Sequence, residues 1–123
     1  MYGYGFDEQG RQVAIIAATD DGELAHAEFN LYDEGGVVAE DLAITGNGTV
    51  EKSLYDIRGK LVYLARYFQG RLVLESMHHH GPLGRLKESR FYSGDGALMR
   101  KDVYRYNDAG LRIEQQSEFF GVR

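Results

Sequence analysis

The sequence predicts an all-β protein, an antiparallel meander of about ten strands built from hairpin repeats. A turn signal that ends in glycine, followed by an apolar residue one or two places further on, recurs along the whole chain. The glycines of these turns stand at positions 10, 22, 36, 48, 59, 70, 84, 96 and 110. Their spacing matches one short strand plus one tight turn. The chain has 123 residues, the length of a single domain, which we place at residues 1–123.

The segments between the glycines have the composition of strands. Residues 13–18 and 23–28 contain enough alanine to propagate a helix, but they are short and occupy the same repeat positions as clear β-segments. We therefore expect strands in both places. Residues 61–68 are rich in aromatic and aliphatic side chains. Residues 71–77 follow after Gln69-Gly70, a pair that predicts a two-residue hairpin turn.

The later segments differ from the central one in polarity. Residues 61–68 are apolar on both faces, which predicts a central strand buried on both sides. Residues 85–90 and 100–105 carry charges on both faces, which is typical of edge strands or of a solvated wall. Because an open single-layer sheet would leave an apolar face in water, we expect the sheet to curl into a half-shell or a barrel, or to form a homodimer.

The charge is distributed unevenly along the chain. The net charge is −5, but residues 1–60 hold 12 acidic and 4 basic side chains, whereas residues 61–123 hold 7 acidic and 10 basic ones. An acidic half attracts a basic protein and repels nucleic acid and anionic membranes. We therefore expect a basic protein partner, no nucleic acid and no membrane. The alternative is an ordinary charged, solvated surface. The candidate partner-binding residues are Asp20, Asp21, Glu23, Glu28, Glu40 and Asp41.

Composition also bears on the compartment. The chain contains no cysteine, which excludes disulfides and cysteine-ligated zinc and fits a reducing environment. Residues 1–7 lack the basic start and apolar run of a secretion signal, and no segment has about 18 consecutive apolar residues. We expect a cytoplasmic protein.

A run of three histidines, His78-His79-His80, is the candidate metal site, since neutral imidazoles bind transition metals. On a strand the first and third would share a face, so at most two could converge, with His26 or an acidic side chain as a further ligand. The alternative, which we favour, is a polar loop without a metal. We expect no cofactor.

Three aspartates, Asp7, Asp33 and Asp56, follow an aromatic residue at the same point of successive repeats. Their periodicity predicts a turn-forming role, in which each carboxylate accepts a hydrogen bond from nearby backbone N–H groups. A catalytic pair would instead place its two carboxyls in different environments. We therefore predict no catalytic residues.

The chain holds nine tyrosines and six phenylalanines, enough for a surface on which sugars or bases could stack. Packing across strands or in a core is the alternative. The candidate ligand-binding residues are Tyr63, Tyr67, Tyr104 and Tyr106.

Two segments, Tyr55-Asp56-Ile57-Arg58-Gly59-Lys60-Leu61 and Tyr32-Asp33-Glu34-Gly35-Gly36-Val37-Val38, resemble the YD repeat of the Rhs family. The family unit runs Tyr-Asp, two spacers, Gly, a basic residue and Leu. The chain is also similar to the Gly-x-Leu hairpin repeats of MORN-type proteins and of the bacterial antitoxins built from them. In Rhs proteins such repeats form a curved β-shell around a toxin domain. This chain is too short to enclose a domain, so the resemblance implies an isolated β-repeat module.

Together these features predict a non-enzymatic, protein-binding module that acts as an immunity or antitoxin-like inhibitor of a toxin or other effector protein. The alternative is a small-ligand or glycan-binding β-barrel lined by tyrosines. A third hypothesis is a hydrolase or isomerase that depends on His26 or His78.

Overall fold

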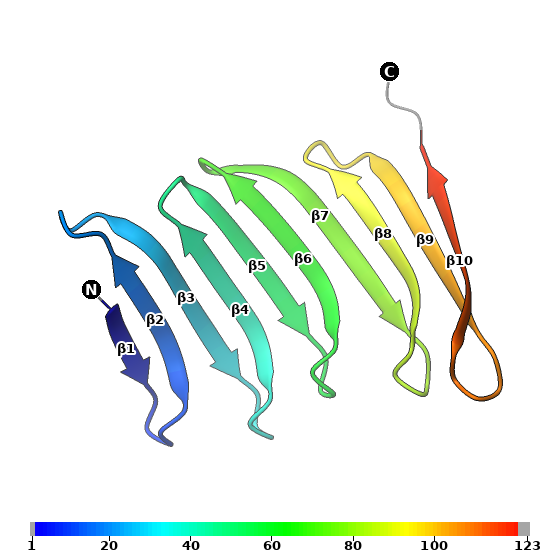
Figure 1. The fold of residues 1–123 in the computed structure, drawn as a ribbon, viewed down its shortest axis with the longest axis horizontal. Helices are drawn as coiled ribbons and strands as arrows, with labels where there is room; N and C mark the ends of the chain where they lie inside the picture. The colour runs from blue at the N-terminus through cyan, green and yellow to red at the C-terminus, as the bar shows by residue number, and fades with distance from the viewer. Residues whose placement is uncertain (1, 121–123) are drawn as a thin grey trace.

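The structure is a computed structural model that describes residues 2–120. These residues form ten strands: β1 (Tyr2–Phe6), β2 (Gln12–Ala18), β3 (Leu24–Tyr32), β4 (Val38–Thr45), β5 (Thr49–Tyr55), β6 (Leu61–Phe68), β7 (Arg71–His80), β8 (Leu86–Ser93), β9 (Leu98–Tyr106) and β10 (Arg112–Phe119). Consecutive strands pair antiparallel in one sheet, in chain order from β1 to β10 (Figure 1). The predicted all-β meander is therefore confirmed. The described residues contain no helix, and hence no helix that could span a membrane.

The sheet is open. β1 pairs with β2 and β10 pairs with β9, and these two end strands do not pair with each other, so the described residues form no barrel. The strands bend along their length in Figure 1, which makes the sheet curved rather than flat. Because chain order equals spatial order, the acidic first half and the basic second half of the sequence occupy opposite ends of the sheet.

The turns fall at two edges of the sheet and use two designs. Five turns lie at the lower edge in Figure 1, which we call the aspartate edge: residues 7–11, 33–37, 56–60, 81–85 and 107–111. The opposite, hydroxyl edge holds the turns at residues 19–23, 45–48, 68–71 and 93–97. All nine glycines of the repeat have a positive φ, from 77° to 91°. L-residues with a side chain rarely adopt that conformation, which explains why glycine recurs there.

The shortest turn is the predicted two-residue hairpin. Gln69 and Gly70 have φ angles of 49° and 82°, so both central residues are left-handed, as a type I′ turn requires. The other turns of the hydroxyl edge begin with a hydroxyl residue that bonds to the third residue of the turn. Thr19 donates to Asp21, Thr45 to Asn47 and Ser93 to Asp95.

Strand pairing sorts the side chains onto two faces. Ser53, Leu64 and Ser76 are successive cross-strand partners, and Ser89 lies two residues before the next partner, Phe91. We call their side of the sheet the serine face. The opposite side, which carries Ala27 and Ala65, is the alanine face.

Small residues occupy the buried positions of this single layer. Ala27 and Ala65 are the buried apolar residues of the described chain, with 4% and 0% exposure. The buried polar residues are Ser53, Ser76, Ser89 and Asp102. Long side chains on neighbouring strands cover small residues in one layer, whereas no second layer covers the large ones.

One expectation about an individual strand was wrong, and for two other segments one of the two alternatives is excluded. β6 is central in the strand order, as predicted, but it is not buried on both sides: Ala65 is its one buried residue, and Phe68 is 43% exposed. The segments 85–90 and 100–105 were expected to be edges or a solvated wall, and they are not edges, because β8 and β9 both lie inside the sheet. In a single layer, internal strands remain wet on both faces, so their charges need not mark an edge.

The three histidines also lie differently from the favoured prediction. They form the end of β7 rather than a polar loop, with His78 paired to Ser89 and His79 to Glu88. No group of three or more potential metal ligands comes together among the described residues.

Candidate functional site

An acidic cluster of Glu28, Asp41 and Glu51 lies on the serine face of β3, β4 and β5. Register places all three there, because Asp41 pairs with Ser53, and Glu28 and Glu51 both pair with Ala43. Burial, together with the negative charges of Glu28 and Glu51, raises the pKa of Asp41. Its Oδ1 atom is buried and has no hydrogen-bond partner within residues 2–120. Asp41 is therefore a carboxylate whose charge is only partly offset, by the positive charge of His26 and by a hydrogen bond from the Leu42 backbone.

Two basic groups border the acidic cluster. Arg66 forms an ion pair with Glu51, with 2.9 Å between Nη2 and Oε2. His26 lies 3.7 Å from Glu28, measured from Nε2 to Oε2, and contributes a positive charge when protonated. Neither contact reaches Asp41 Oδ1.

The six predicted partner-binding residues do not form one surface. Asp20, Asp21 and Glu23 lie at the exposed turn between β2 and β3. Glu28 and Asp41 share the serine face, where Glu51 joins them; sequence reasoning had missed Glu51, whose signal is its cross-strand position. Glu40 lies on the alanine face and forms an ion pair with Lys52, with 3.3 Å between Oε1 and Nζ.

The four candidate ligand-binding tyrosines are also divided. Tyr63 and Tyr67 lie on the alanine face of β6, where the hydroxyl of Tyr63 donates a hydrogen bond to Glu75. This bond is the main reason that the pKa of Tyr63 rises to about 12. The register across β7 and β8 places Tyr104 and Tyr106 on the serine face of β9. The four rings therefore line no common surface.

A row of polar side chains crosses the serine face from β7 to β9. His78 lies between two serines, with Nε2 2.9 Å from Ser76 Oγ and Nδ1 2.8 Å from Ser89 Oγ. Burial and the nearby His80 lower the pKa of His78, which favours the neutral imidazole. Asp102, the cross-strand neighbour of Ser89, is 2% exposed and accepts a hydrogen bond of 2.9 Å from Arg100 Nε.

This row contains serine, histidine and aspartate, but their arrangement differs from a catalytic triad. Both imidazole nitrogens face serine hydroxyls, so no carboxylate orients the ring. The two hydroxyls are also enclosed, with Ser76 3% and Ser89 1% exposed. Burial pushes the pKa of Asp102 upward, but hydrogen bonds from Arg100 and Ser117 outweigh it and lower that pKa. The row can satisfy buried polar groups, and it offers no accessible nucleophile.

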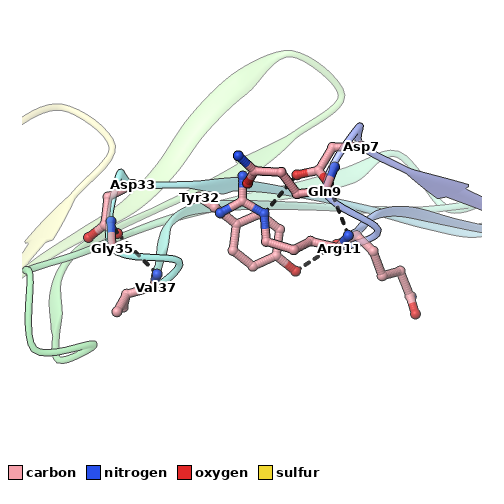
Figure 2. A network of polar contacts seen from close by, with 8 residues as sticks. Asp7, Gln9, Arg11, Tyr32, Asp33, Gly35 and Val37 are labelled. Atoms are coloured by element: carbon pink, nitrogen blue, oxygen red, sulfur yellow. Dashed lines mark hydrogen bonds and ion pairs between the residues drawn. The ribbon is translucent and has the colours of Figure 1, made fainter.

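The aspartate edge repeats one polar arrangement (Figure 2). Asp7 Oδ1 accepts hydrogen bonds of 2.9 Å from the N–H groups of Gln9 and Arg11. Asp33 and Asp56 bind the equivalent N–H groups of their own turns at 2.9 to 3.0 Å. The predicted turn-forming role of the three aspartates is therefore confirmed. Backbone hydrogen bonds are also the largest cause that lowers the pKa of Asp7 and of Asp56.

A tyrosine from the following repeat closes over two of these turns. The Tyr32 hydroxyl donates to the Gln12 carbonyl at 2.7 Å, and the Arg11 guanidinium lies 4.6 Å from the centre of the Tyr32 ring (Figure 2). Tyr106 repeats this contact near the other end of the chain, with the Leu86 carbonyl at 2.7 Å and Arg85 at 5.7 Å. Tyr32 and Tyr106 thus each tie two successive hairpins together.

Comparison with known proteins gives fold-level likeness only. No family model matches the chain, and no curated protein does. A porin-like protein from Bacteroides uniformis is similar in structure, at 14% identity and a TM-score of 0.50, over 87% of this chain and 44% of that one. A TcdB2–TccC3 chain matches more weakly, at 13% identity and a TM-score of 0.37, over 94% of this chain and 7% of that one. S. aureus TarM matches at 16% identity and a TM-score of 0.39, over 83% of this chain and 17% of that one. The chain thus spans less than half of each of these proteins, and the likeness to the porin-like protein shows a β-sheet fold.

Proposed function

We propose that this chain is a non-catalytic protein-binding module that inhibits a basic toxin or effector protein, as an immunity protein or antitoxin does. The observation that carries the proposal is the acidic cluster of Glu28, Asp41 and Glu51. Holding these like charges together, one of them partly desolvated, raises the free energy of the unbound protein. A cation from a partner would lower it. The resemblance to Rhs-type and MORN-like repeats supports the same class of function.

The open sheet suits this role. Both faces are uncovered, so a partner can approach the acidic cluster along the serine face. Because the acidic strands lie together at one end of the sheet, their field adds up there and steers a basic partner. We further propose that the protein is cytoplasmic and binds neither nucleic acid nor membranes.

The test removes the same number of charges from two places. One variant carries E28Q, D41N and E51Q, and the matched control carries D20N, D21N and E23Q in the exposed turn. Each protein is immobilised and exposed to lysate at low and high salt, and any stoichiometric basic protein is identified by intact mass. Its association with purified wild type and variants is then measured.

We expect the face variant to lose association rate and salt dependence and the turn variant to retain most of both. Equal binding by all three proteins would refute the acidic cluster as the contact surface. If no protein is captured but a soluble sugar raises the melting temperature, the ligand-binding alternative gains support instead.

A further inference from the structure

The fourth turn of the aspartate edge differs from its relatives in one residue. The turns at residues 7–11, 33–37 and 56–60 begin with aspartate, and the turn at 107–111 begins with asparagine. In each of these four, the first side chain accepts a hydrogen bond from the N–H of the fifth residue. The turn at 81–85 begins with Gly81, which has no side-chain acceptor.

The backbone of this turn nevertheless matches the others. The N–H of Gly81 donates to the Arg85 carbonyl and that of Gly84 to the Gly81 carbonyl, both at 2.9 Å. The same pair of bonds forms in the Asp7 and Asp56 turns. The N–H groups of Leu83 and Arg85 therefore hold the positions that bind a carboxylate elsewhere in this chain, and residues 2–120 supply no acceptor for either.

The surroundings of the turn are cationic. A depression of ≈ 410 Å³ lies beside it, between the Asp56 turn and Gly81, and its lining includes Arg58, Lys87 and His80. A Cβ atom on Gly81 would lie 2.9 Å from Lys87 Cδ, so the lysine stem runs directly past the turn. His80 Nδ1 is buried and has no hydrogen-bond partner among the described residues.

One carboxylate, that of Asp56, already lines this depression, and its Oδ1 atom is occupied. Asp56 Oδ1 accepts hydrogen bonds of 2.9 Å from the N–H groups of Arg58 and Lys60 in its own turn. Arg58 is held across the gap, because its Nη1 donates to the Pro82 carbonyl at 3.0 Å. The balance of charge around the Gly81 turn therefore favours an added anion.

We propose that the Gly81 turn is a carboxylate-binding site, in which the N–H groups of Leu83 and Arg85 donate hydrogen bonds to one carboxylate oxygen and Lys87 supplies the positive charge. The chain itself shows the geometry, since its other turns hold an aspartate oxygen at 2.9 to 3.0 Å from the equivalent N–H groups. The ligand is an exogenous carboxylate, from an acidic side chain of a protein or from a small organic acid. The site is independent of the acidic cluster, which lies on β3 to β5.

The experiment follows the amide signals of Leu83 and Arg85 by NMR during titration with sodium acetate, with sodium chloride at equal ionic strength as the reference. We expect saturable shifts with acetate and none with chloride. A blocked tripeptide with a central glutamate forms a second arm. Tighter binding of the peptide points to a protein side chain, and tighter binding of acetate to a small acid.

Two variants test the mechanism. G81D gives the turn its own carboxylate and should abolish the shifts; φ at Gly81 is not positive, so aspartate fits the backbone once the Lys87 stem moves. D56G removes the carboxylate from the neighbouring turn and should create acetate-dependent shifts at Arg58 and Lys60. K87Q should weaken binding at the Gly81 turn without changing the turn itself.

The proposal fails if chloride reproduces the acetate shifts, if no saturable shift occurs, or if G81D binds acetate as well as the wild type does. The spectrum of each variant also shows whether it folds, since the amides of distant strands should not move.

Discussion

Replacing Tyr32 by phenylalanine should weaken the link between two hairpins by a measurable amount. The hydroxyl of Tyr32 makes one hydrogen bond, to the Gln12 carbonyl at 2.7 Å, while its ring stacks under Arg11. Phenylalanine keeps the ring and removes the hydrogen bond alone. A hydrogen bond of this kind contributes about 0.5–1.5 kcal/mol to stability, and Y32F should lower the free energy of unfolding by that amount.

The repeat supplies matched comparisons for this substitution. Tyr106 makes the equivalent bond to Leu86 at the same length, so Y106F should have the same cost. Tyr55 occupies the same motif position, but its hydroxyl has no hydrogen bond to any residue in the range 2–120, so Y55F should change stability by less than about 0.5 kcal/mol. Tyr32 and Tyr106 share no partner, and the costs of Y32F and Y106F should therefore add.

Urea unfolding followed by circular dichroism measures the three single variants and the Y32F/Y106F pair. Amide exchange at β2 and β8 locates the loss along the sheet. If Y55F destabilises the protein as much as Y32F does, the hydroxyl bonds are not the source of the effect and the reasoning is refuted.

Three further predictions concern the turns and the titrating groups. G94A should lower the free energy of unfolding more than G70A does, because a Cβ at Gly94 would lie 2.1 Å from the Leu72 carbonyl oxygen. A Cβ at Gly70 has open space, so G70A costs only the backbone strain of a positive φ, about 1–2 kcal/mol. Urea unfolding midpoints compare the two variants, and the reverse order would contradict the clash. The pKa of Asp41 is higher in the folded protein than the 3.8 of an unfolded chain. The folded state therefore loses stability as the pH rises from 3.8 through the folded pKa. D41N should therefore stabilise the protein at pH 7 and lose that advantage below pH 3.8, and a pH-independent difference would argue against the titration. The pKa of His78 is lower in the folded protein than the 6.5 of an unfolded chain, so stability should fall as the pH drops from 6.5 through the folded pKa. NMR should show His78 titrating below pH 6.5, and a pKa above 6.5 would refute its buried, neutral state.

The local features of the fold could be predicted from sequence because they depend on neighbouring residues. Each repeat glycine falls where the chain needs a positive φ, and Asp7 caps N–H groups two and four residues away. Composition and repeat spacing predicted the strands, including residues 13–18, where alanine alone would have favoured a helix. These signals need no knowledge of distant contacts.

The assembly of the site could not be predicted in the same way because it depends on register across several strands. Strand pairing and bulges place Tyr63 and Tyr104 on opposite faces and bring Glu51 beside Asp41, and no local pattern records either result. Which side chains are buried could be predicted even less well. Charged Asp102 is among the most buried residues, whereas apolar Phe68 is exposed, because in a single layer side-chain size decides burial.

The strict chain-order pairing gives the protein a one-dimensional energy landscape. Every strand contacts only the strands before and after it, so contacts between residues distant in sequence add nothing beyond adjacent hairpins. Unfolding can then begin at β1 or β10 and advance one hairpin at a time, and folding can start in any hairpin and spread in both directions. Each hairpin therefore depends for its stability on its immediate neighbours alone. A hairpin gained or lost at either end changes the length of the sheet without disturbing its interior strands.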